Sequence, residues 1–292
     1  QLINRSVGGV LIDAEGAVSA LSQVERANVA QEIRAAVASA PGDLQEHSDL
    51  RMISLRGLQQ TLEQLSAENK PIPDDVRYLA GLQRVEYVFL IPERNDIVLA
   101  GPAEGWIVGA TGDVVGVNSG QPVVRLDDLI VALESHTGSN RSNISCSIDP
   151  TPAGRQQLQK FLSSQRVFNP RVTAGVEKAL GPQQITLEGV STDSHLASVL
   201  VASDYRMKSL AMHFETAPVA GMPSFLEMMK SARGGMNNMM PRWWMACDYD
   251  AIARSEDGMT WQLRGQGVKV MTEDEVIGAD GSVAGSGQVN PI

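Results

Sequence analysis

Four histidines and two cysteines are the side chains of this sequence best suited to nucleophilic or metal chemistry. The histidines are scattered, and no HxH, HExxH or CxxC spacing brings two ligands onto one face of an element. The sequence therefore predicts no metal site. Glycine motifs that bind phosphates, GxxxxGK[ST] or GxGxxG, are also missing, so we expect no nucleotide and no other cofactor.

A serine hydrolase would need a nucleophile, a base and an orienting acid. Ser191, Asp193 and His195 lie close together in the sequence, at the expected start of a helix. Neighbours at a helix start rarely face one another as a triad does, so we expect the residues from Ser191 to Asp193 to cap the helix and His195 to lie on its surface. A thiol hydrolase that pairs Cys146 with His136, ten residues earlier, is an unspecific alternative. No catalytic residue is predicted.

Charged residues near the expected turns leave two interpretations open. Glu93, Arg94, Asp96 and Glu104 surround two short strands and the connections between them. They can line a polar cleft, or they can be exposed loop charges. Their neighbours, mostly Gly and Pro, are typical of turns rather than of a catalytic site.

The cysteines, Cys146 and Cys247, each lie in an alternating stretch that is typical of a strand. The alternation points both thiols toward apolar layers. Two interpretations stay open: a pair of buried reduced thiols, or one disulfide, which an oxidising compartment would favour. In the chain-entropy model, closing so long a loop stabilises the fold by about 4–5 kcal/mol.

Methionine is concentrated in the second half of the chain, where nine of the twelve lie between Met207 and Met245. Thioethers can bind copper(I), but the single MxxM spacing does not match the regular spacing of copper motifs. Flexible apolar side chains suit a core or a contact surface equally well. We expect a neighbouring subunit to cover the densest part, although folding back onto the chain's own sheet is the other outcome. The predicted interface residues are Met236, Met239, Met240, Trp243 and Trp244.

Composition limits the partners. The net charge of −10 repels the phosphate backbone, so we expect neither nucleic acid nor an anionic membrane surface as a partner. No run of about 18 apolar residues occurs, so no transmembrane segment is predicted. The start at Gln1 is interpreted as a mature end left by processing or as an arbitrary boundary.

Hydrophobic periodicity predicts an α+β fold of mixed, largely antiparallel sheets with packed helices. Two lobes are predicted, an N-terminal α+β lobe over residues 1–165 and a C-terminal α+β lobe over 166–292. Helices are expected over 22–38, 55–66, 73–82, 125–135, 151–164, 169–180, 193–210 and 223–232. Strands are expected within 7–18, 85–91, 96–101, 105–117, 143–149, 183–190 and 211–218, with a long hairpin near 242–272.

Several longer strings carry a family resemblance. They include GGVLIDAEG (8–16), LAGLQRVEYVFLIPERNDIVLAGPAEGW (79–106), ISCSIDPTPAG (144–154) and VLVASDYRMKSLAM (199–212). In these strings the chain resembles a family from exported proteins of planctomycete bacteria, described as domain of unknown function 1598. The resemblance implies no catalytic residue and no ligand. It implies export to the periplasm, the cell surface or the extracellular space, and chains that continue beyond the position of Ile292.

The sequence therefore predicts an exported, non-catalytic protein that acts through protein–protein contacts. Its expected partner is protein, including copies of itself, in a homo-oligomer that self-assembles into an envelope or extracellular structure. The alternative is a hydrolase with an unrecognised active site.

Overall fold

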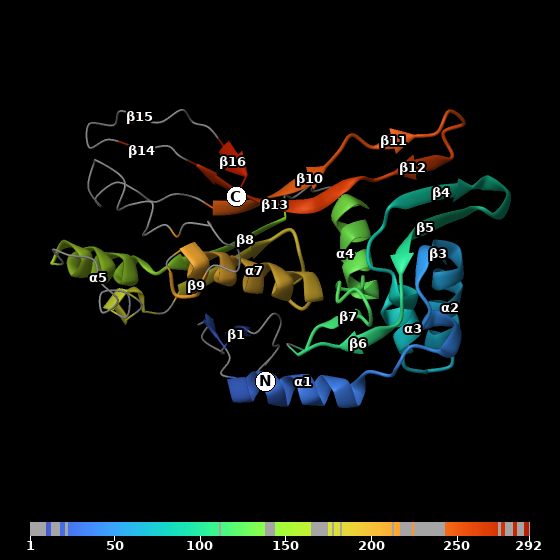
Figure 1. Ribbon diagram of the computed structural model, residues 1–292, viewed down its shortest axis with the longest axis horizontal. Helices are drawn as coiled ribbons and strands as arrows, with labels where there is room; N and C mark the ends of the chain where they lie inside the picture. The colour runs from blue at the N-terminus through green and yellow to red at the C-terminus, as the bar shows by residue number, and fades with distance from the viewer. Residues whose placement is uncertain are drawn as a thin grey trace.

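The computed structural model describes residues 10–12, 18–20, 23–110, 112–137, 144–164, 175–176, 178–181, 183–211, 213–216, 224, 243–273, 276–277, 283–284 and 289–291. Within these ranges helices and short sheets are mixed along the chain (Figure 1). Every pairing between described strands is antiparallel. The predicted α+β fold with largely antiparallel sheets is confirmed.

The largest sheet has five strands in the order β11-β12-β4-β5-β3. Strand β4 (Tyr87–Ile91) pairs on one side with β5 (Asp96–Ala103), which pairs in turn with β3 (Ser48–Ser54). On its other side β4 pairs with β12 (Thr260–Gln262), which forms a hairpin with β11 (Ala253–Arg254). A hairpin from the end of the chain thus completes a sheet whose other strands come from the first third (Figure 1).

Helix α2 (Leu55–Ala67) follows β3 directly and packs against this sheet. The Ser54 hydroxyl accepts the Gly57 N–H at 2.8 Å and so satisfies one unpaired donor of the first turn. The predicted helix over 55–66 is confirmed. The core beneath it is built from Leu79, Leu82 and Leu126, with Ile53, Leu58, Leu62, Val76, Val85, Val124 and Leu129 packed around them.

The third predicted helix is much shorter than expected. α3 covers only Asp74–Arg77, and a 3-10 turn follows it, η2 (Leu79–Gly81). Leu79 and Ala80 both have positive φ angles, 46° and 52°. At Gly81 the chain passes so close to the Glu104 carbonyl that a Cβ atom would lie 2.0 Å from its oxygen. This sharp bend ends the helix, and Leu79 lies buried in the core.

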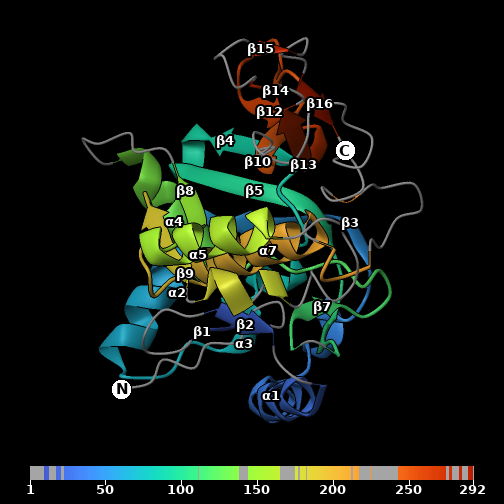
Figure 2. The same ribbon diagram turned by 90° about the vertical axis from the view of Figure 1, so that its left-hand side faces the viewer.

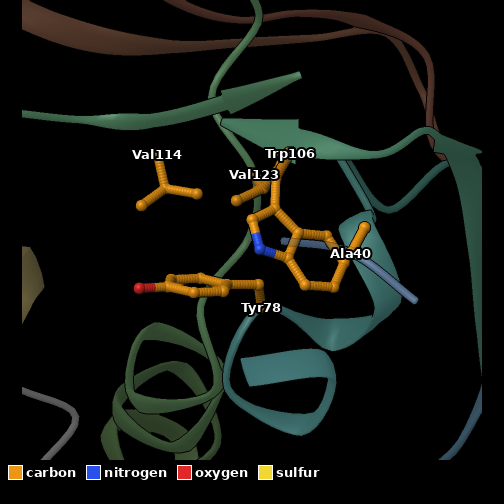
Figure 3. Close-up of a cluster of buried hydrophobic side chains, with 5 residues drawn as sticks. All are labelled: Ala40, Tyr78, Trp106, Val114 and Val123. Atoms are coloured by element: carbon orange, nitrogen blue, oxygen red, sulfur yellow. The ribbon is translucent and has the colours of Figure 1, made fainter. Parts of the chain in front are cut away.

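A second core cluster lies around Trp106 (Figure 3). It joins α1 (Gln23–Ala36) to the hairpin of β6 (Trp106–Val108) and β7 (Val114–Gly116). The Trp106 indole N–H donates to the Ala38 carbonyl at 3.0 Å, and the ring lies 5.8 Å from that of Tyr78. The buried members are Ala40, Tyr78, Trp106, Val114 and Val123.

The middle of the chain forms a two-stranded sheet of β8 (Ser145–Pro150) and β9 (Gln183–Glu188). Three helices accompany it: α4 (Leu126–Thr137), α5 (Pro152–Ser163) and α7 (His195–Ala211). The Thr151 hydroxyl caps α5 by accepting the Gly154 N–H at 3.1 Å, as the sequence predicts. The strand predicted over 211–218 is wrong for residues 213–216, because the N–H groups of Phe214 and Glu215 fold back onto the Ser209 carbonyl.

The predicted long hairpin is confirmed, but it has two parts. β10 (Trp243–Tyr249) and β13 (Gly265–Glu273) form a ribbon, which β16 (Val289–Pro291) joins. A bulge between Asp248 and Tyr249 ends the ribbon, and the β11–β12 tip continues into the five-stranded sheet. In both views the ribbon and α1 lie on opposite sides of the molecule (Figure 1, Figure 2). The remaining short elements are β1 (Val10–Ile12), β2 (Val18–Ala20), η1 (Gly42–Leu44), η3 (Pro92–Arg94), β14 (Val276–Ile277) and β15 (Val283–Ala284).

The division into lobes at residue 165 stays a prediction. Two sheets join residues from its two sides, since β8 pairs with β9 and β4 pairs with β12. In the described part of the chain, no helix has the length and apolar character needed to cross a bilayer.

Candidate functional site

Helix α7 begins at His195, against the first turn of α4. The His195 backbone N–H donates to Asp127 at 3.2 Å, and the ring Nδ1 lies 2.8 Å from Asp128 Oδ2. The Ser194 hydroxyl accepts the Ala197 N–H at 3.1 Å and caps the helix. The sequence-based placement of His195 is wrong: the side chain is half-buried between two helices, because α4 supplies carboxylates that hold it there.

A carboxylate that holds an imidazole is the orienting half of a catalytic triad. In the described residues, the hydrogen bonds of His195 end on Asp127 and Asp128, and none involves a serine or a cysteine. Ser191 and Asp193 interact with each other in the preceding turn, through the Asp193 N–H and the Ser191 hydroxyl at 3.4 Å. Among the described residues, the arrangement joins the start of α7 to the first turn of α4.

Asp204 is a buried carboxylate on the face of α7 that packs on β8. Its Oδ2 accepts the Ile148 N–H at 3.0 Å and the Lys208 ammonium at 2.7 Å. Lys208 also donates to the Ile148 carbonyl. Burial raises the pKa of Asp204, while the hydrogen bond and the charge of Lys208 act in the opposite direction. Together these bonds clamp the helix to the middle of the strand.

Cys146 lies beside this clamp, on β8 opposite Leu187 of β9. Its thiol is half-buried, and burial, helped by the nearby Asp204 charge, raises the pKa of Cys146 to about 11. Such a thiol is protonated near neutral pH and is a poor nucleophile. His136, its proposed partner in a thiol hydrolase, has its side chain outside the described residues.

Both cysteines are free in the structure. Cys146 is half-buried rather than fully buried as predicted, and the predicted placement of Cys247 in an apolar layer is wrong, because Cys247 lies exposed on β10. The alternation does place Cys247 on the same face of β10 as Met245 and Tyr249, but no layer of described residues covers this face. The structure therefore has two thiols in different environments.

Glu104 is the most deeply buried charged group of the described residues, with 1% of its surface exposed. Its carboxylate accepts bonds from the Ser119 N–H at 2.9 Å, the Ser119 hydroxyl, the Asn118 side-chain amide at 2.9 Å and the Gln83 amide at 2.9 Å. Burial raises the pKa of this group, but the hydrogen bonds from Ser119 and Asn118 outweigh burial and lower the pKa to about 2. The carboxylate holds the turn that follows β7.

Glu104 is thus neither part of a cleft nor an exposed loop charge, and its three predicted companions do not gather around it. Glu93 and Arg94 lie exposed in η3. Asp96 lies beside the start of α2, where it accepts the Ser54 hydroxyl at 2.6 Å and the Arg56 N–H at 3.0 Å. These bonds lower the pKa of Asp96. The buried carboxylates Glu104 and Asp204 each join separate elements of the fold through hydrogen bonds.

The β10–β13 ribbon carries several exposed apolar side chains. Four exposed side chains lie on one face of it: Met245, Cys247, Tyr249 and Val268. Cys247 and Val268 are direct cross-strand partners, so they share this face. The charged pair Asp248 and Lys269, 2.9 Å apart, lies on the opposite face. We call the uncharged surface the ribbon face.

The predicted interface falls largely outside what the structure describes. Met236, Met239 and Met240 lie outside the described residues, and for Trp243 and Trp244 only the backbone, at the start of β10, is described. The neighbouring Met245 is exposed. Among the described side chains, no three His, Cys, Asp or Glu residues are grouped so as to hold a metal ion.

Residues 146–225 match the model of a family described as protein of unknown function (DUF1598). The resemblance to domain of unknown function 1598 is thereby confirmed for this stretch. The matched stretch contains the complete clamp of Ile148, Asp204 and Lys208, and it contains Cys146. Searches of curated proteins and of solved structures find no match.

Proposed function

We propose that this protein acts without catalysis, through protein–protein contacts, and that its partner is a second copy of the chain. The observation that carries the proposal is the ribbon face, where Met245, Cys247, Tyr249 and Val268 lie exposed together. Large apolar side chains gathered on one strand ribbon are typical of a contact surface, whereas single exposed ones are not.

The charge of the chain explains why such a contact would be apolar. Each copy carries a net charge of −10, so the overall electrostatic interaction between two copies is repulsive. Among the described side chains, the ribbon face carries no ionised group, because Asp248 and Lys269 lie on the other side and pair with each other. Two copies that meet through this face bring no like charges together there and bury apolar area at about 25 cal/mol per Å².

We further propose that the protein is exported and that the assembly belongs to an envelope or extracellular structure. The support is the resemblance of the strings quoted above to a family of exported planctomycete proteins, together with the match over residues 146–225. Fractionation of the source cells, followed by detection of the chain, tests this. Recovery in the cytoplasmic fraction alone contradicts it.

Cysteine cross-linking tests self-association. In the Cys146→Ser variant the exposed Cys247 is the single thiol, and a short bismaleimide should join two chains through the ribbon face. The Cys247→Ser variant, which keeps only the half-buried Cys146, should give no cross-linked product under the same conditions. Light scattering on the untreated protein should give a mass above that of one chain.

A charge placed on the ribbon face provides the second measurement. Val268→Glu should lower the cross-linking yield of the Cys146→Ser protein at least about tenfold, since a buried unpaired charge is costly. Gln59→Glu, which adds the same charge on the exposed surface of α2, should leave the yield unchanged. A monomeric mass at every concentration, with no cross-linked product, overturns the proposal.

A further inference from the structure

The β11–β12 tip docks on β4 through backbone hydrogen bonds and through the Gln262 side-chain amide, which donates to the Tyr87 hydroxyl at 2.7 Å. The Leu90 N–H donates to the Met259 carbonyl and the Leu263 N–H donates to the Glu86 carbonyl, both at 2.8 Å. Between these bonds, Thr260 lies opposite Phe89 and Gln262 lies opposite Tyr87. Backbone pairing of this kind is available to any copy of the same strand, so β4 can accept β12 from its own chain or from another.

The tip holds its own shape. Its turn is closed by a hydrogen bond from the Ser255 N–H to the Thr260 carbonyl at 2.9 Å. The Asp257 carboxylate accepts two more hydrogen bonds, one from the Ser255 hydroxyl and one from the Met259 N–H at 2.9 Å. The Arg254 guanidinium lies 5.4 Å from the centre of the Trp261 ring on the neighbouring strand. A hairpin with these internal contacts can move as one unit.

The β11–β12 tip is connected to the β10–β13 ribbon by two irregular segments, which we call the crossings: residues 250–252 and residues 263–264. They are linked by the Asp250 N–H, which donates to the Arg264 carbonyl at 3.0 Å. The ribbon side of the crossings has a bulge after Asp248, and Gly265 and Gly267 have φ angles of 116° and 97°. Only glycine adopts such angles without strain, so the backbone bends here where other residues would keep it straight. The crossings have the features of a hinge (Figure 1).

Exposed apolar side chains gather at this hinge. Tyr249 is 55% exposed, Ile252 is 60% exposed and Val268 is 58% exposed. In one copy these three side chains face solvent. When two copies exchange an arm, their hinges run past each other, and side chains at the hinge gain a partner surface that a single copy does not offer. The position of the exposed residues therefore points to a second copy of this chain.

We propose that the β11–β12 hairpin is an exchangeable arm, with β12 of one copy completing the five-stranded sheet of another copy by pairing with its β4. This inference rests on the proposed self-association and names its geometry. The acceptor is the β4 edge, residues 87–91, and the donor is the segment 253–262. Each β12 leaves its own β4 and pairs with β4 of the other copy, so neither β4 is left without this partner.

Disulfide trapping between chains tests the exchange. Phe89 and Thr260 form a non-hydrogen-bonded pair between β4 and β12, because the adjacent backbone hydrogen bond joins Leu90 to Met259. Such pairs have the closer side chains and suit a disulfide. In a background without Cys146 and Cys247, a Phe89→Cys chain mixed with a Thr260→Cys chain should give, under mild oxidation, a linked species of twice the chain mass. Phe89→Cys mixed with Gln59→Cys, which places the thiol on exposed α2, should give none above random collision.

The chain that carries both Phe89→Cys and Thr260→Cys provides the reference. An intrachain bridge in this double variant, with no linked product from the mixed single variants, means that β12 stays on its own β4 and overturns the exchange. A double variant with neither an intrachain nor an interchain bridge also overturns it, because β12 then does not pair with β4. Cross-linking through Cys247 in the Cys146→Ser protein would persist in both cases, so a failed exchange is distinguishable from a failed self-association.

Discussion

Ser119 donates two hydrogen bonds to Glu104, one from its backbone N–H at 2.9 Å and one from its hydroxyl, and so holds a carboxylate that is almost wholly out of water. In the sequence, Glu104 precedes the β6–β7 hairpin and Ser119 follows it. A Cβ atom at Gly116 would lie 2.0 Å from Glu104 Oε1, so the neighbouring chain is fitted closely to the carboxylate. A buried charge survives here because each oxygen meets donors.

Replacement of this carboxylate by an amide should be costly. Glu104→Gln places an NH₂ group where donors already point, and leaves at least one buried donor without an acceptor. We expect a loss of about 2–3 kcal/mol in the free energy of unfolding. Urea unfolding at pH 7 measures it. Glu93→Gln, an exposed change in η3, is the control and should stay within about 0.5 kcal/mol of the parent; equal stabilities of the two variants contradict the buried-charge account.

The same carboxylate predicts a dependence of stability on pH. Its folded pKa of about 2 lies below the ordinary value of 4.5, so the ionised form favours the folded state. This contribution is complete above about pH 5 and is lost as the pH falls from about 4.5 to about 2. Between pH 5 and pH 3 the parent should lose about 2 kcal/mol more than Glu104→Gln does. Parallel losses in the two proteins would show that Glu104 is not the source.

Local signals in the sequence predicted several helices, although α3 is much shorter than expected. Ser54 and Thr151 precede their helices as capping residues should, and the apolar spacing from residue 193 to residue 210 predicted α7. The strand β3 gave no such signal. Its register shifts between Ser48 and Arg51, opposite Pro102, which has no N–H to offer, and the bulge hides the alternation.

Long-range placement could not be predicted in the same way. No local pattern specifies that β12 pairs with β4, because the register is set by strands about 170 residues apart. Glu104 resembled a loop charge because its donors, Ser119 and Asn118, are contributed by another turn. For Asp204 a signal did exist: it is a carboxylate among apolar positions of α7, with Lys208 one turn later. The carboxylates that hold His195 come from α4 and carried no signal at the helix start.

The clamp between α7 and β8 should depend on Lys208 more than its surface position suggests. Lys208→Met leaves the Asp204 charge buried without its cation and is expected to destabilise the protein by about 1–3 kcal/mol. Arg206→Met, two residues earlier on α7, removes the ion pair of Arg206 with Glu215, whose side chains are 59% and 42% exposed. That control should cost less than about 1 kcal/mol. Thermal unfolding of both variants at pH 7 compares them, and a larger loss in Arg206→Met would refute the clamp.

The two thiols should react at very different rates, because one is half-buried with its pKa raised and the other is exposed. At a pKa of about 11, Cys146 has a thiolate fraction of about 0.001 at pH 8, roughly 200-fold below that of an ordinary thiol. In the Cys247→Ser protein, Cys146 should therefore react with a chromogenic disulfide at least about 100-fold faster after urea unfolding than in the folded state. Its folded-state rate should rise about tenfold for each pH step between 8 and 10, since the thiolate is the reacting form. In the Cys146→Ser protein the exposed Cys247 should react quickly, and unfolding should change its rate little. A folded-state rate for Cys146 equal to its unfolded rate would contradict its placement beside Asp204.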